Sequence, residues 1–460
     1  MSSALPEWAE RAGFRRLART LLPQSLRRLI GGRPLLARLL GNSAWQIGDS
    51  LFRMGTGVVV SAYVARYLGP PGFGLINLGV ALFTLFTAVA QFGMNTIVVR
   101  DLIERPDERR VLLGSALLLR LAGGVASIAL AVGASALIRP GDYRCALVVL
   151  IIAASAMPRA WDIIDYDYQS RIHSGPVVVA RNLSFIILAG VRVLMVVMRA
   201  PLEWFAAAIT AEAALATVLL LRRWRADGLQ VGVGSAAKKE LWQLLTTGWP
   251  LVIAGMSISV YMRIDQVMLG RMVGDSGVGL FSAAVRVSEA LYFLPLAACT
   301  SVAPALTAAR RRSVAEYERR MLSVMRVLVW LALGVALIFA VLSRAIIHAL
   351  YGPAYAGAAA VLSIHAWVGV LVSMSLCSNQ WLSNEGYLKY TMYQTLAGAA
   401  VNVILNLSLI PWLGVVGAAL ASCAGQLVSV VLTTGILPRT RRLLTLQLAA
   451  LVPLYTPSFA

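Results

Sequence analysis

Long apolar runs separated by glycine, proline and charged residues make up most of the sequence. A helix needs about 20 apolar residues to cross the hydrocarbon core of a bilayer, where its backbone groups must be bonded internally. Many runs reach this length. The pattern predicts twelve transmembrane helices, at residues 43–67, 74–99, 111–138, 144–165, 175–198, 202–221, 244–269, 278–307, 321–350, 358–383, 389–411 and 415–437.

The composition supports a membrane protein. Hydrophobic residues make up 59% of the 460 residues and charged residues 13%, whereas soluble domains carry about 25% charged residues. Polar side chains are therefore too few to cover a water-soluble globule, and the apolar runs lack the alternation of a β-barrel. We expect an all-α integral membrane protein.

Basic residues give the chain a net charge of +20 and gather on one side of the predicted membrane. The segments on that side hold 27 lysines and arginines, and those on the opposite side hold five. Because basic loops stay in the cytoplasm, both termini are predicted to be cytoplasmic. Topology accounts for the charge, so we expect no nucleic-acid partner.

The predicted helices divide into two lobes of six. The expected parts are an Arg-rich cytoplasmic arm (1–41), an N-terminal lobe (42–222), a cytoplasmic linker (223–241), a C-terminal lobe (242–438) and a cytoplasmic tail (439–460). The arm is expected to lie on anionic lipid headgroups, with about 1 kcal/mol from each basic residue. Four cysteines stand singly in apolar stretches and are interpreted as small apolar residues.

Two glycine-rich turns indicate an internal duplication. Residues 65–75 read ARYLGPPGFGL and residues 270–280 read GRMVGDSGVGL, so an offset of 205 residues aligns Arg66 with Arg271 and Gly74 with Gly279. The glycines suit positive φ angles, and each arginine is expected to cap the carbonyls that end the first helix of its own lobe. An even number of helices per lobe makes the repeats parallel, as in transporters that rock two bundles around a central site.

Nine arginines and six acids fall inside the predicted helices. A charge at the bilayer centre costs about 3 kcal/mol on insertion scales, so most of these side chains should face one another or an aqueous interior. Arg326 and Arg344 lie where they can extend to the interface. The candidates for binding an anion are the remaining arginines, Arg53, Arg120, Arg159, Arg181, Arg192, Arg263 and Arg286.

The excess of arginine over acid is the functional signal. It leaves three cations without an intramembrane partner, and guanidinium groups bind phosphate bidentately at any pH. Pyrophosphate fits such a site. Asp49, Asp265 and Glu289 are candidates for coupling to H⁺ or Na⁺; no cofactor or structural metal is otherwise expected.

A structural interpretation of the same charges stays open. Oppositely charged side chains three or four residues apart share a helix face and can form ion pairs that hold helices together. The spaced sets are Asp49 with Arg53 in the first helix, Arg159 with Asp162 and Asp165 in the fourth, and Arg286 with Glu289 in the eighth.

Three stretches resemble a known family. Residues 42–86 (NSAWQIGDSLFRMGTGVVVSAYVARYLGPPGFGLINLGVALFTLF) resemble the opening of polysaccharide transporters, residues 402–422 (NVILNLSLIPWLGVVGAALAS) their penultimate turn, and residues 350–359 (LYGPAYAGAA) their ninth-to-tenth helix connection. The resemblance extends across nearly all of residues 42–438. The family is that of the Wzx-like polysaccharide and O-antigen flippases, in the multidrug/oligosaccharidyl-lipid/polysaccharide superfamily.

The resemblance implies a MATE-like fold of twelve helices in two lobes arranged as a V. It also implies a flippase that moves undecaprenyl-pyrophosphate-linked oligosaccharide across the bacterial inner membrane by alternating access, for polysaccharide biosynthesis and export. Arg53 matches the family position expected to bind pyrophosphate. The implied partners are this lipid-linked glycan, membrane lipids, a polysaccharide polymerase and a chain-length regulator.

Other functions are weighed against the flippase. A multidrug or other small-molecule antiporter of the superfamily should have an acidic cavity for organic cations, whereas arginine outnumbers acid here. A lipid II flippase usually carries further helices after the twelfth, for which the tail is too short. A membrane glycosyltransferase or polymerase needs catalytic side chains on a sizeable loop or domain, and DIIDYDYQ (162–169) beside short connections is the one candidate. We expect a transporter rather than an enzyme.

Overall fold

The computed structural model describes residues 34–228, 231–290 and 292–452, and for residues 34–52 it describes the backbone. The chain divides into two units, residues 1–52 and 53–460, and the account below concerns the second unit. The predictions on the Arg-rich arm before residue 34 and on the last residues of the tail lie outside the described residues.

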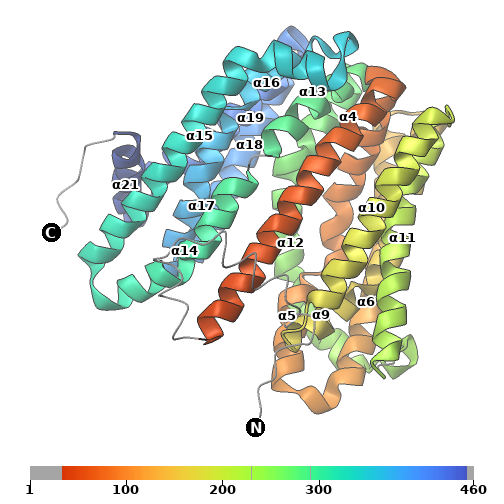
Figure 1. Ribbon diagram of the computed structural model, residues 1–460, viewed down its shortest axis with the longest axis vertical. Helices are drawn as coiled ribbons and strands as arrows, with labels where there is room; N and C mark the ends of the chain where they lie inside the picture. The colour runs from red at the N-terminus through yellow and green to blue at the C-terminus, as the bar shows by residue number, and fades with distance from the viewer. Residues whose placement is uncertain (1–33, 229–230, 291, 453–460) are drawn as a thin grey trace. The chain divides into compact units, whose positions relative to one another are not determined.

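The regular structure of the described residues is helical (Figure 1). The helices are α4 (Pro34–Gln91), α5 (Met94–Glu104), α6 (Arg109–Ile138), α7 (Tyr143–Ala153), α8 (Ala156–Arg159), α9 (Ile163–Ser170), α10 (Gly175–Val197), α11 (Leu202–Ala226), α12 (Lys238–Met272), α13 (Asp275–Glu289), α14 (Phe293–Arg312), α15 (Val314–Tyr351), α16 (Ala358–His365), α17 (Val368–Asn384), α18 (Leu388–Leu413), α19 (Val415–Leu427), α20 (Thr433–Ile436) and α21 (Arg441–Leu451).

Within the described residues, eleven helical stretches are long and apolar enough to cross a membrane. The first, Arg53–Glu104, has 52 residues and a helical length of about 78 Å, more than twice the hydrocarbon thickness. It turns back at Gly69, whose φ of 66° and ψ of 172° are not helical, so this stretch crosses twice. The crossings match the predicted helices, and the all-α multi-pass membrane fold is confirmed.

Several crossings are interrupted at corresponding places in the two halves. The second breaks between α4 and α5, where Phe92 and Gly93 have positive φ, and the eighth is divided between α13 and α14. The fourth passes through a 3₁₀ turn at Ala160–Asp162, and the tenth breaks at Ala366 between α16 and α17. Because 205 residues separate Ala366 from Trp161 in this turn, the breaks of the fourth and tenth crossings follow the period of the sequence repeat.

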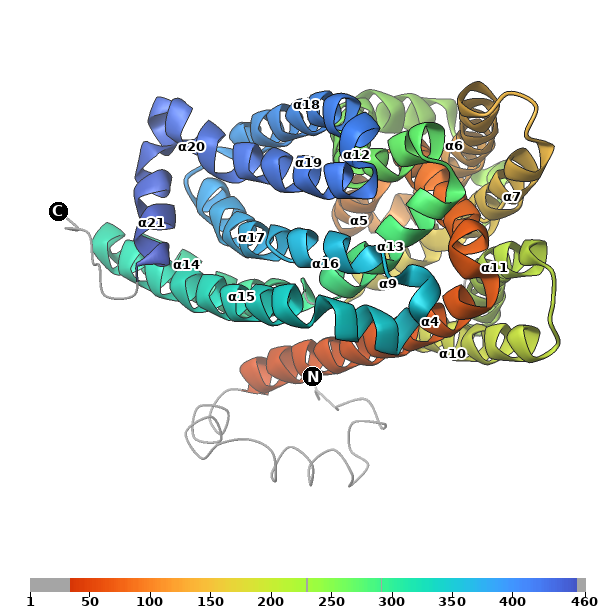
Figure 2. The same cartoon turned by 90° about the horizontal axis from the view of Figure 1, so that it is seen from above.

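The helices α4–α11 (the N-terminal half) and α12–α20 (the C-terminal half) share one hydrophobic core, and each half is the main contributor to one further core. In the shared core, Leu78 of α4 packs with Val278 and Phe281 of α13. The further cores lie among α5, α6, α9, α10 and α11 together with Leu244 of α12, and among α14, α15, α17 and α21. Figure 2 shows α14, α15 and α17 on one side of α12 and α13, and α6, α10 and α11 on the other side.

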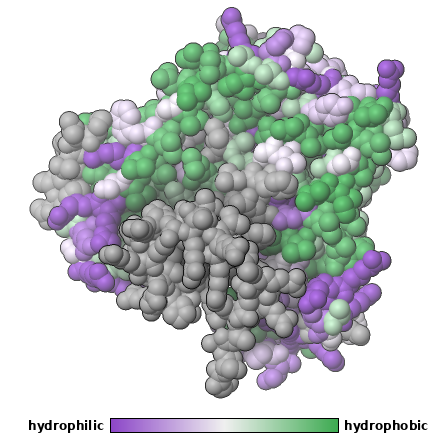
Figure 3. All heavy atoms as spheres, in the orientation of Figure 1, coloured by the Kyte–Doolittle hydropathy of each residue, from purple (hydrophilic) through white to green (hydrophobic). Residues whose placement is uncertain are grey.

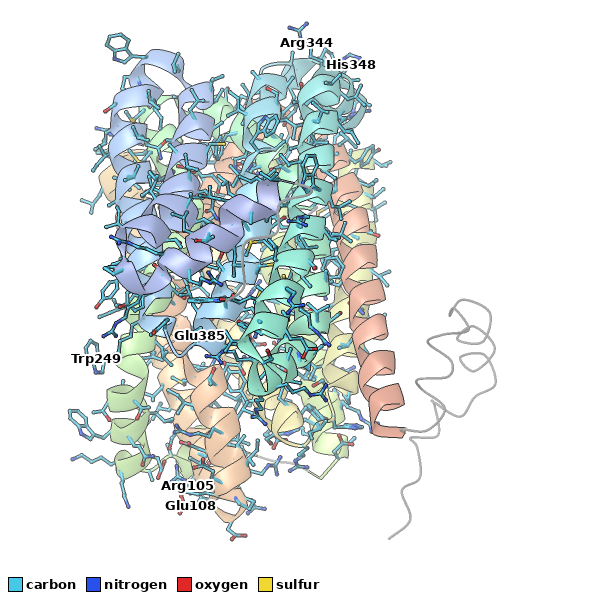
Figure 4. All side chains as sticks on the ribbon, turned by 90° about the vertical axis from the view of Figure 1, so that its left-hand side faces the viewer. Arg105, Glu108, Trp249, Arg344, His348 and Glu385 are labelled. Carbon is cyan, nitrogen blue, oxygen red and sulfur yellow. The ribbon has the colours of Figure 1, made fainter. Side chains whose placement is uncertain are left out.

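The two ends of the molecule differ in these contacts. We call the end that carries the turns at 65–75 and 270–280 the repeat end, and the end that carries Arg105, Glu108 and residues 231–237 the linker end (Figure 4). The shared core lies toward the repeat end and the further cores toward the linker end. The halves therefore share a core at the repeat end, and at the linker end the start of α12 also contacts the N-terminal half through Leu244 and through the 2.9 Å ion pair of Arg105 with Glu240.

The repeat turns confirm one prediction and correct another. Gly69 and Gly274 have φ angles of 66° and 91°, the conformation predicted for glycine. The prediction for the arginines was wrong. Arg66 donates a hydrogen bond to Leu350 O and Arg271 donates one to Ile138 O, so each arginine reaches the end of the third helix of the opposite half, because the two halves meet there.

The predicted tail contains a packed helix, α21. Gln447 is fully buried, and its Nε2 donates to Ser378 Oγ at 2.9 Å and to Val430 O at 3.0 Å. Arg442 forms an ion pair with Glu318 of α15 at 2.7 Å. Helix α21 therefore belongs to the C-terminal half.

Exposed apolar side chains are numerous along the crossings. On the face in Figure 3 they form a broad band, and hydrophilic side chains gather toward the two ends. Exposed residues such as Leu137, Val341 and Ile436 are costly in water but stable in lipid. This surface fits a membrane environment.

Candidate functional site

Three arginines from both halves interact around α13. Arg192 of α10 and Arg263 of α12 lie close enough to Arg286 for their positive charges to repel its own. Arg192 Nη2 lies 2.8 Å from Glu212 Oε2, and Arg263 Nη2 lies 3.9 Å from Glu289 Oε2. We call these five residues the central cluster. Its three guanidinium groups and two carboxylates leave one positive charge.

Arg286 is the member of the cluster without a carboxylate partner in the part of the chain that the structure describes. Its side chain lies deep among the helices, and it is nevertheless in contact with solvent. Its Nη1 donates to Ser61 Oγ on α4 at 2.9 Å, which joins the two halves. A cation at this depth needs water or an anion, and the exposure of Arg286 gives its guanidinium access to solvent.

The pairing of Arg286 with Glu289, suggested by their spacing, is not formed. Glu289 pairs instead with Arg263 on α12, because both Arg286 and Glu289 face other helices across the cluster. The longer 3.9 Å separation makes this the looser of the two ion pairs, since a hydrogen bond would need about 3 Å.

Arg53 is held by neutral groups of α10. Its Nη1 donates to Asn182 Oδ1 at 3.2 Å, and its Cζ lies 5.1 Å from the centre of the Phe185 ring. These contacts orient the half-buried guanidinium and leave its charge in place. The side chain of Asp49 lies outside the described residues, so its pairing with Arg53 and its coupling role stay predictions.

Arg120 is tied into the N-terminal half. It is 4% exposed, and its Nη2 lies 2.6 Å from Arg159 O and 3.3 Å from Asp162 Oδ2. Its Nη1 donates to the hydroxyl of Tyr166. This arrangement favours the structural interpretation of Arg120, a predicted anion-binding residue.

Arg181 and Arg159 differ in whether an acid pairs with them. Arg181 Nη2 lies 3.0 Å from Asp165 and 3.4 Å from Asp162, so acids already neutralise it. The side chain of Arg159 is exposed and forms no ion pair with the described residues. Spacing suggested that Arg159 pairs with Asp162, but Arg120 and Arg181 occupy that carboxylate.

Asp265 is the centre of a buried polar network in the C-terminal half. It is 6% exposed, and its Oδ1 accepts a hydrogen bond from Asn402 Nδ2 at 2.9 Å and another from Asn406. Its Oδ2 accepts one from Ser422 Oγ at 2.6 Å. Among the described residues no basic side chain pairs with it, and the buried Asn406 Oδ1 has no hydrogen-bond partner. Carboxylate, amide and hydroxyl oxygens are ligands that suit hard cations.

The two arginines expected to extend to the interface have different surroundings. Arg344 is exposed near the repeat end of α15, beside His348 (Figure 4), as that expectation requires. Arg326 Nη2 donates to Ala449 O of α21 at 3.2 Å. Arg326 therefore helps to hold α21.

Sequence reasoning missed the neutral partners. Ser61, Phe185 and Ser422 lie on other helices than the charges they contact, so spacing along the chain carries no signal for them. Asn402 and Asn406 did carry a signal, because two amides four residues apart share one face of an apolar helix. The thiols of Cys299 on α14 and Cys377 on α17, interpreted as small apolar side chains standing singly, lie 3.5 Å apart.

Repeated halves with cations between them define a two-lobed membrane transporter fold. The model of the polysaccharide biosynthesis protein family matches residues 39–309, more than half of the chain, and the chain belongs to this family. The MatE family model matches residues 250–408. The family predicted from the sequence resemblance is confirmed.

Individual relatives agree. The probable flippase AglR of Haloferax volcanii is 24% identical over 444 residues, which cover 88% of this chain and 84% of the relative. The lipid II flippase MurJ in an inward closed conformation has a TM-score of 0.70 at 14% identity, over 89% of this chain and 93% of MurJ. An inward-facing multidrug resistance MATE family transporter of the MOP superfamily has a TM-score of 0.67 at 15% identity, over 87% of this chain and 95% of that transporter. These structures share the fold.

Proposed function

We propose that this protein is a flippase that moves an oligosaccharide linked to undecaprenyl pyrophosphate from one leaflet to the other by alternating access. The observation that carries the proposal is Arg286, a solvent-exposed cation that joins the two halves with no acid partner among the described residues. The family and the relative named a probable flippase support the same class of activity.

Phosphate is the anion that suits the central cluster. Guanidinium forks match phosphate oxygens in pairs, and a pyrophosphate carries enough negative charge to engage more than one arginine. Arg263 is the first candidate to join Arg286, because its contact with Glu289 is loose at 3.9 Å. Binding would transfer Arg263 from Glu289 to the phosphate.

The remaining parts of the substrate fit the surroundings of the cluster. A glycan needs water along its path, and the exposure of Arg286 between the halves provides a wet surface. A polyprenyl chain stays in lipid, against the apolar side chains of the crossings. The arginines of both halves then act on the pyrophosphate alone, so the protein needs no bond-making chemistry and works as a transporter rather than an enzyme.

Asp265 is our candidate for the residue that binds the coupling ion. Three hydrogen bonds stabilise a charged carboxylate, and Asn406 Oδ1 offers a further oxygen without a partner. Na⁺ would bind between these oxygens; H⁺ would bind the carboxylate itself. Movement of α18 and α19 against α12 would change this set of ligands and link ion binding to the conformation.

The bacterial inner membrane is the proposed location, with both termini in the cytoplasm and the linker end facing it. The 27 basic residues on the predicted cytoplasmic side, against five, support this orientation. A polysaccharide polymerase and a chain-length regulator are the partners expected to act on the glycan after translocation.

A multidrug antiporter is the second candidate, because the MatE model and the MATE transporter structures match this chain. It would bind organic cations. The net positive central cluster opposes that substrate, and efflux of cationic dyes from cells that express the protein distinguishes the two activities.

Purified protein in vesicles with a fluorescent pyrophosphate-linked oligosaccharide lipid tests the flippase. Arg286→Gln removes one charge-assisted contact of about 1.5–3 kcal/mol, and should weaken binding about 10- to 150-fold. Arg344→Gln, at the exposed end of α15, is the matched control and should flip at the wild-type rate. Equal flipping by Arg286→Gln and wild type at limiting lipid would refute this role of the cluster.

A further inference from the structure

A cavity of about 440 Å³ lies at the linker end, between the N-terminal half and the connection that leads to α12. We call it the linker pocket. Its lining comes from the start of α6, the 3₁₀ turn of the fourth crossing, the end of α11 and the connection, and includes Arg110, Trp161, Trp224, Arg225 and Ser235. Sites for small molecules and cofactors have volumes of about 300–1,000 Å³, so the linker pocket is large enough for a ligand.

Two arginines make the linker pocket positive. Arg110 and Arg225 are exposed, and neither forms an ion pair with the described residues. No acid stands among the described residues that line the pocket. The adjacent Arg109 differs, because Asp167 neutralises it through two contacts of 2.5 Å. Two guanidinium groups are therefore free for an anion, and guanidinium forks match the oxygens of a phosphate.

The aromatic wall of the linker pocket is held in place from behind. Trp224 is 1% exposed, and its Nε1 donates a hydrogen bond to Asp167 Oδ2 at 3.0 Å. Because Asp167 on α9 also accepts from Arg109, its carboxylate ties the start of α6 and the end of α11 to one point. A wall that is already fixed loses little freedom when a ligand binds.

The connection to α12 forms the opposite wall and lies directly on α6. Ser235 Oγ is 3.1 Å from Arg110 O, and the backbone N–H of Ala237 donates to Ser115 Oγ at 3.1 Å. A Cβ atom added to Gly114 would lie 2.3 Å from Ser235 Oγ, so a glycine is needed for this close approach. A ligand between Arg110 and Arg225 would thus touch the segment from which α12 begins.

We propose that the linker pocket binds the phosphate headgroup of an anionic glycerophospholipid. Helices α6 and α11 begin and end at this level, where phospholipid headgroups lie, and tryptophan is enriched there. Basic pockets between transmembrane helices on the cytoplasmic side bind anionic headgroups. Leu221 and Val231 add apolar lining for the part of the lipid that leads to its acyl chains.

The bound lipid is a structural ligand and is distinct from the substrate proposed above. No residue of the central cluster lines the linker pocket. A phosphate that engages Arg110 on α6 and Arg225 on α11 would fasten these two helices to each other and to the connection. The lipid would therefore anchor the start of α12 to the N-terminal half.

The test counts lipids bound to the delipidated, full-length protein by native mass spectrometry during a titration with phosphatidylglycerol. Arg110→Gln and Arg225→Gln should each weaken the tightest binding event about 10- to 150-fold, because each loses one charge-assisted contact. Arg222→Gln is the matched control. Arg222 is exposed on the same turns of α11 and does not line the pocket, so this variant should bind as the wild type does. Equal weakening in all three variants would show attraction to surface charge in general and would overturn the pocket.

Two further measurements identify the ligand and check the fold. Inorganic pyrophosphate should not displace the bound phosphatidylglycerol at equal concentration, and displacement would assign the pocket to a soluble phosphate and overturn the lipid. Without lipid, Arg110→Gln and Arg225→Gln should unfold at the wild-type temperature, since exposed side chains without ion pairs contribute little to stability. Arg286→Gln should keep the lipid, so a failure of the linker pocket and a failure of the flippase proposal are distinguishable.

Discussion

Replacement of Arg120 by alanine should destabilise the protein, whereas replacement of Arg159 should not, although both belong to the predicted anion-binding set. Arg120 is 4% exposed and bonds Tyr166, the carbonyl of Arg159 and Asp162. Interhelical hydrogen bonds in membrane proteins contribute about 0.6 kcal/mol on average and up to about 1.7. Three bonds therefore amount to about 2–5 kcal/mol.

The loss of stability in Arg120→Ala is limited because Asp162 keeps a partner. Arg181 stays 3.4 Å from Asp162, so the variant leaves no uncompensated buried carboxylate, which would cost more. The matched control is Arg159→Ala. The side chain of Arg159 is exposed and its carbonyl, the acceptor for Arg120, survives the substitution, so the expected change is within about 0.5 kcal/mol.

The assay is reversible unfolding in detergent micelles, followed by tryptophan fluorescence. A double-mutant cycle with Tyr166→Phe isolates the bond between Tyr166 and Arg120. The reasoning fails if Arg120→Ala unfolds at the same denaturant concentration as Arg159→Ala. It also fails if Arg120→Ala stays stable but loses binding of the pyrophosphate lipid, because Arg120 would then be a ligand of the substrate.

Two further predictions concern buried polar groups of the C-terminal half. Na⁺ at 100 times its Kd should raise the free energy of unfolding of the wild-type protein by about 2.7 kcal/mol. Asp265→Asn keeps the shape of the side chain but removes its charge, so Na⁺ should not stabilise this variant. If the unfolding of the wild-type protein depends on neither Na⁺ nor pH, Asp265 is not the coupling site. Gln447→Ala should cost about 1–3 kcal/mol for two lost bonds, measured by the same unfolding, and a neutral result would show that α21 is held by its apolar face alone.

The crossings could be predicted because hydrocarbon imposes a length on every helix. An apolar run of about 20 residues is a strong signal in the sequence, and glycine and charged residues marked the connections. Breaks within the crossings were harder to predict. The tenth crossing breaks at Ala366 and Trp367, residue types that carry no turn signal, and packing against neighbouring helices decides their conformation.

The partners of the charged residues were harder to predict from the sequence than the charged residues themselves. Spacing along a helix tells which side chains share a face, and Arg286 and Glu289 do share one. Two side chains on one face of a helix can both contact the neighbouring helices instead of each other. Arg286 therefore donates a hydrogen bond to Ser61, and Glu289 pairs with Arg263. The opposite residue depends on how the halves pack, which sequence spacing leaves open.

The duplication explains why the repeat is recognisable where it is. The two repeat turns contact each other across a pseudo-twofold axis, since a Cβ added to Gly74 would meet Asp275 O and one added to Gly279 would meet Pro70 O. Each turn must therefore suit both roles, as in a symmetric dimer. Arg53 and the arginines of the central cluster carry no such requirement, because the substrate proposed for them is asymmetric. The offset of 205 residues places Ala81 opposite Arg286 and Ile258 opposite Arg53. The chain is therefore symmetric where the two repeat turns contact each other and asymmetric at Arg53 and Arg286.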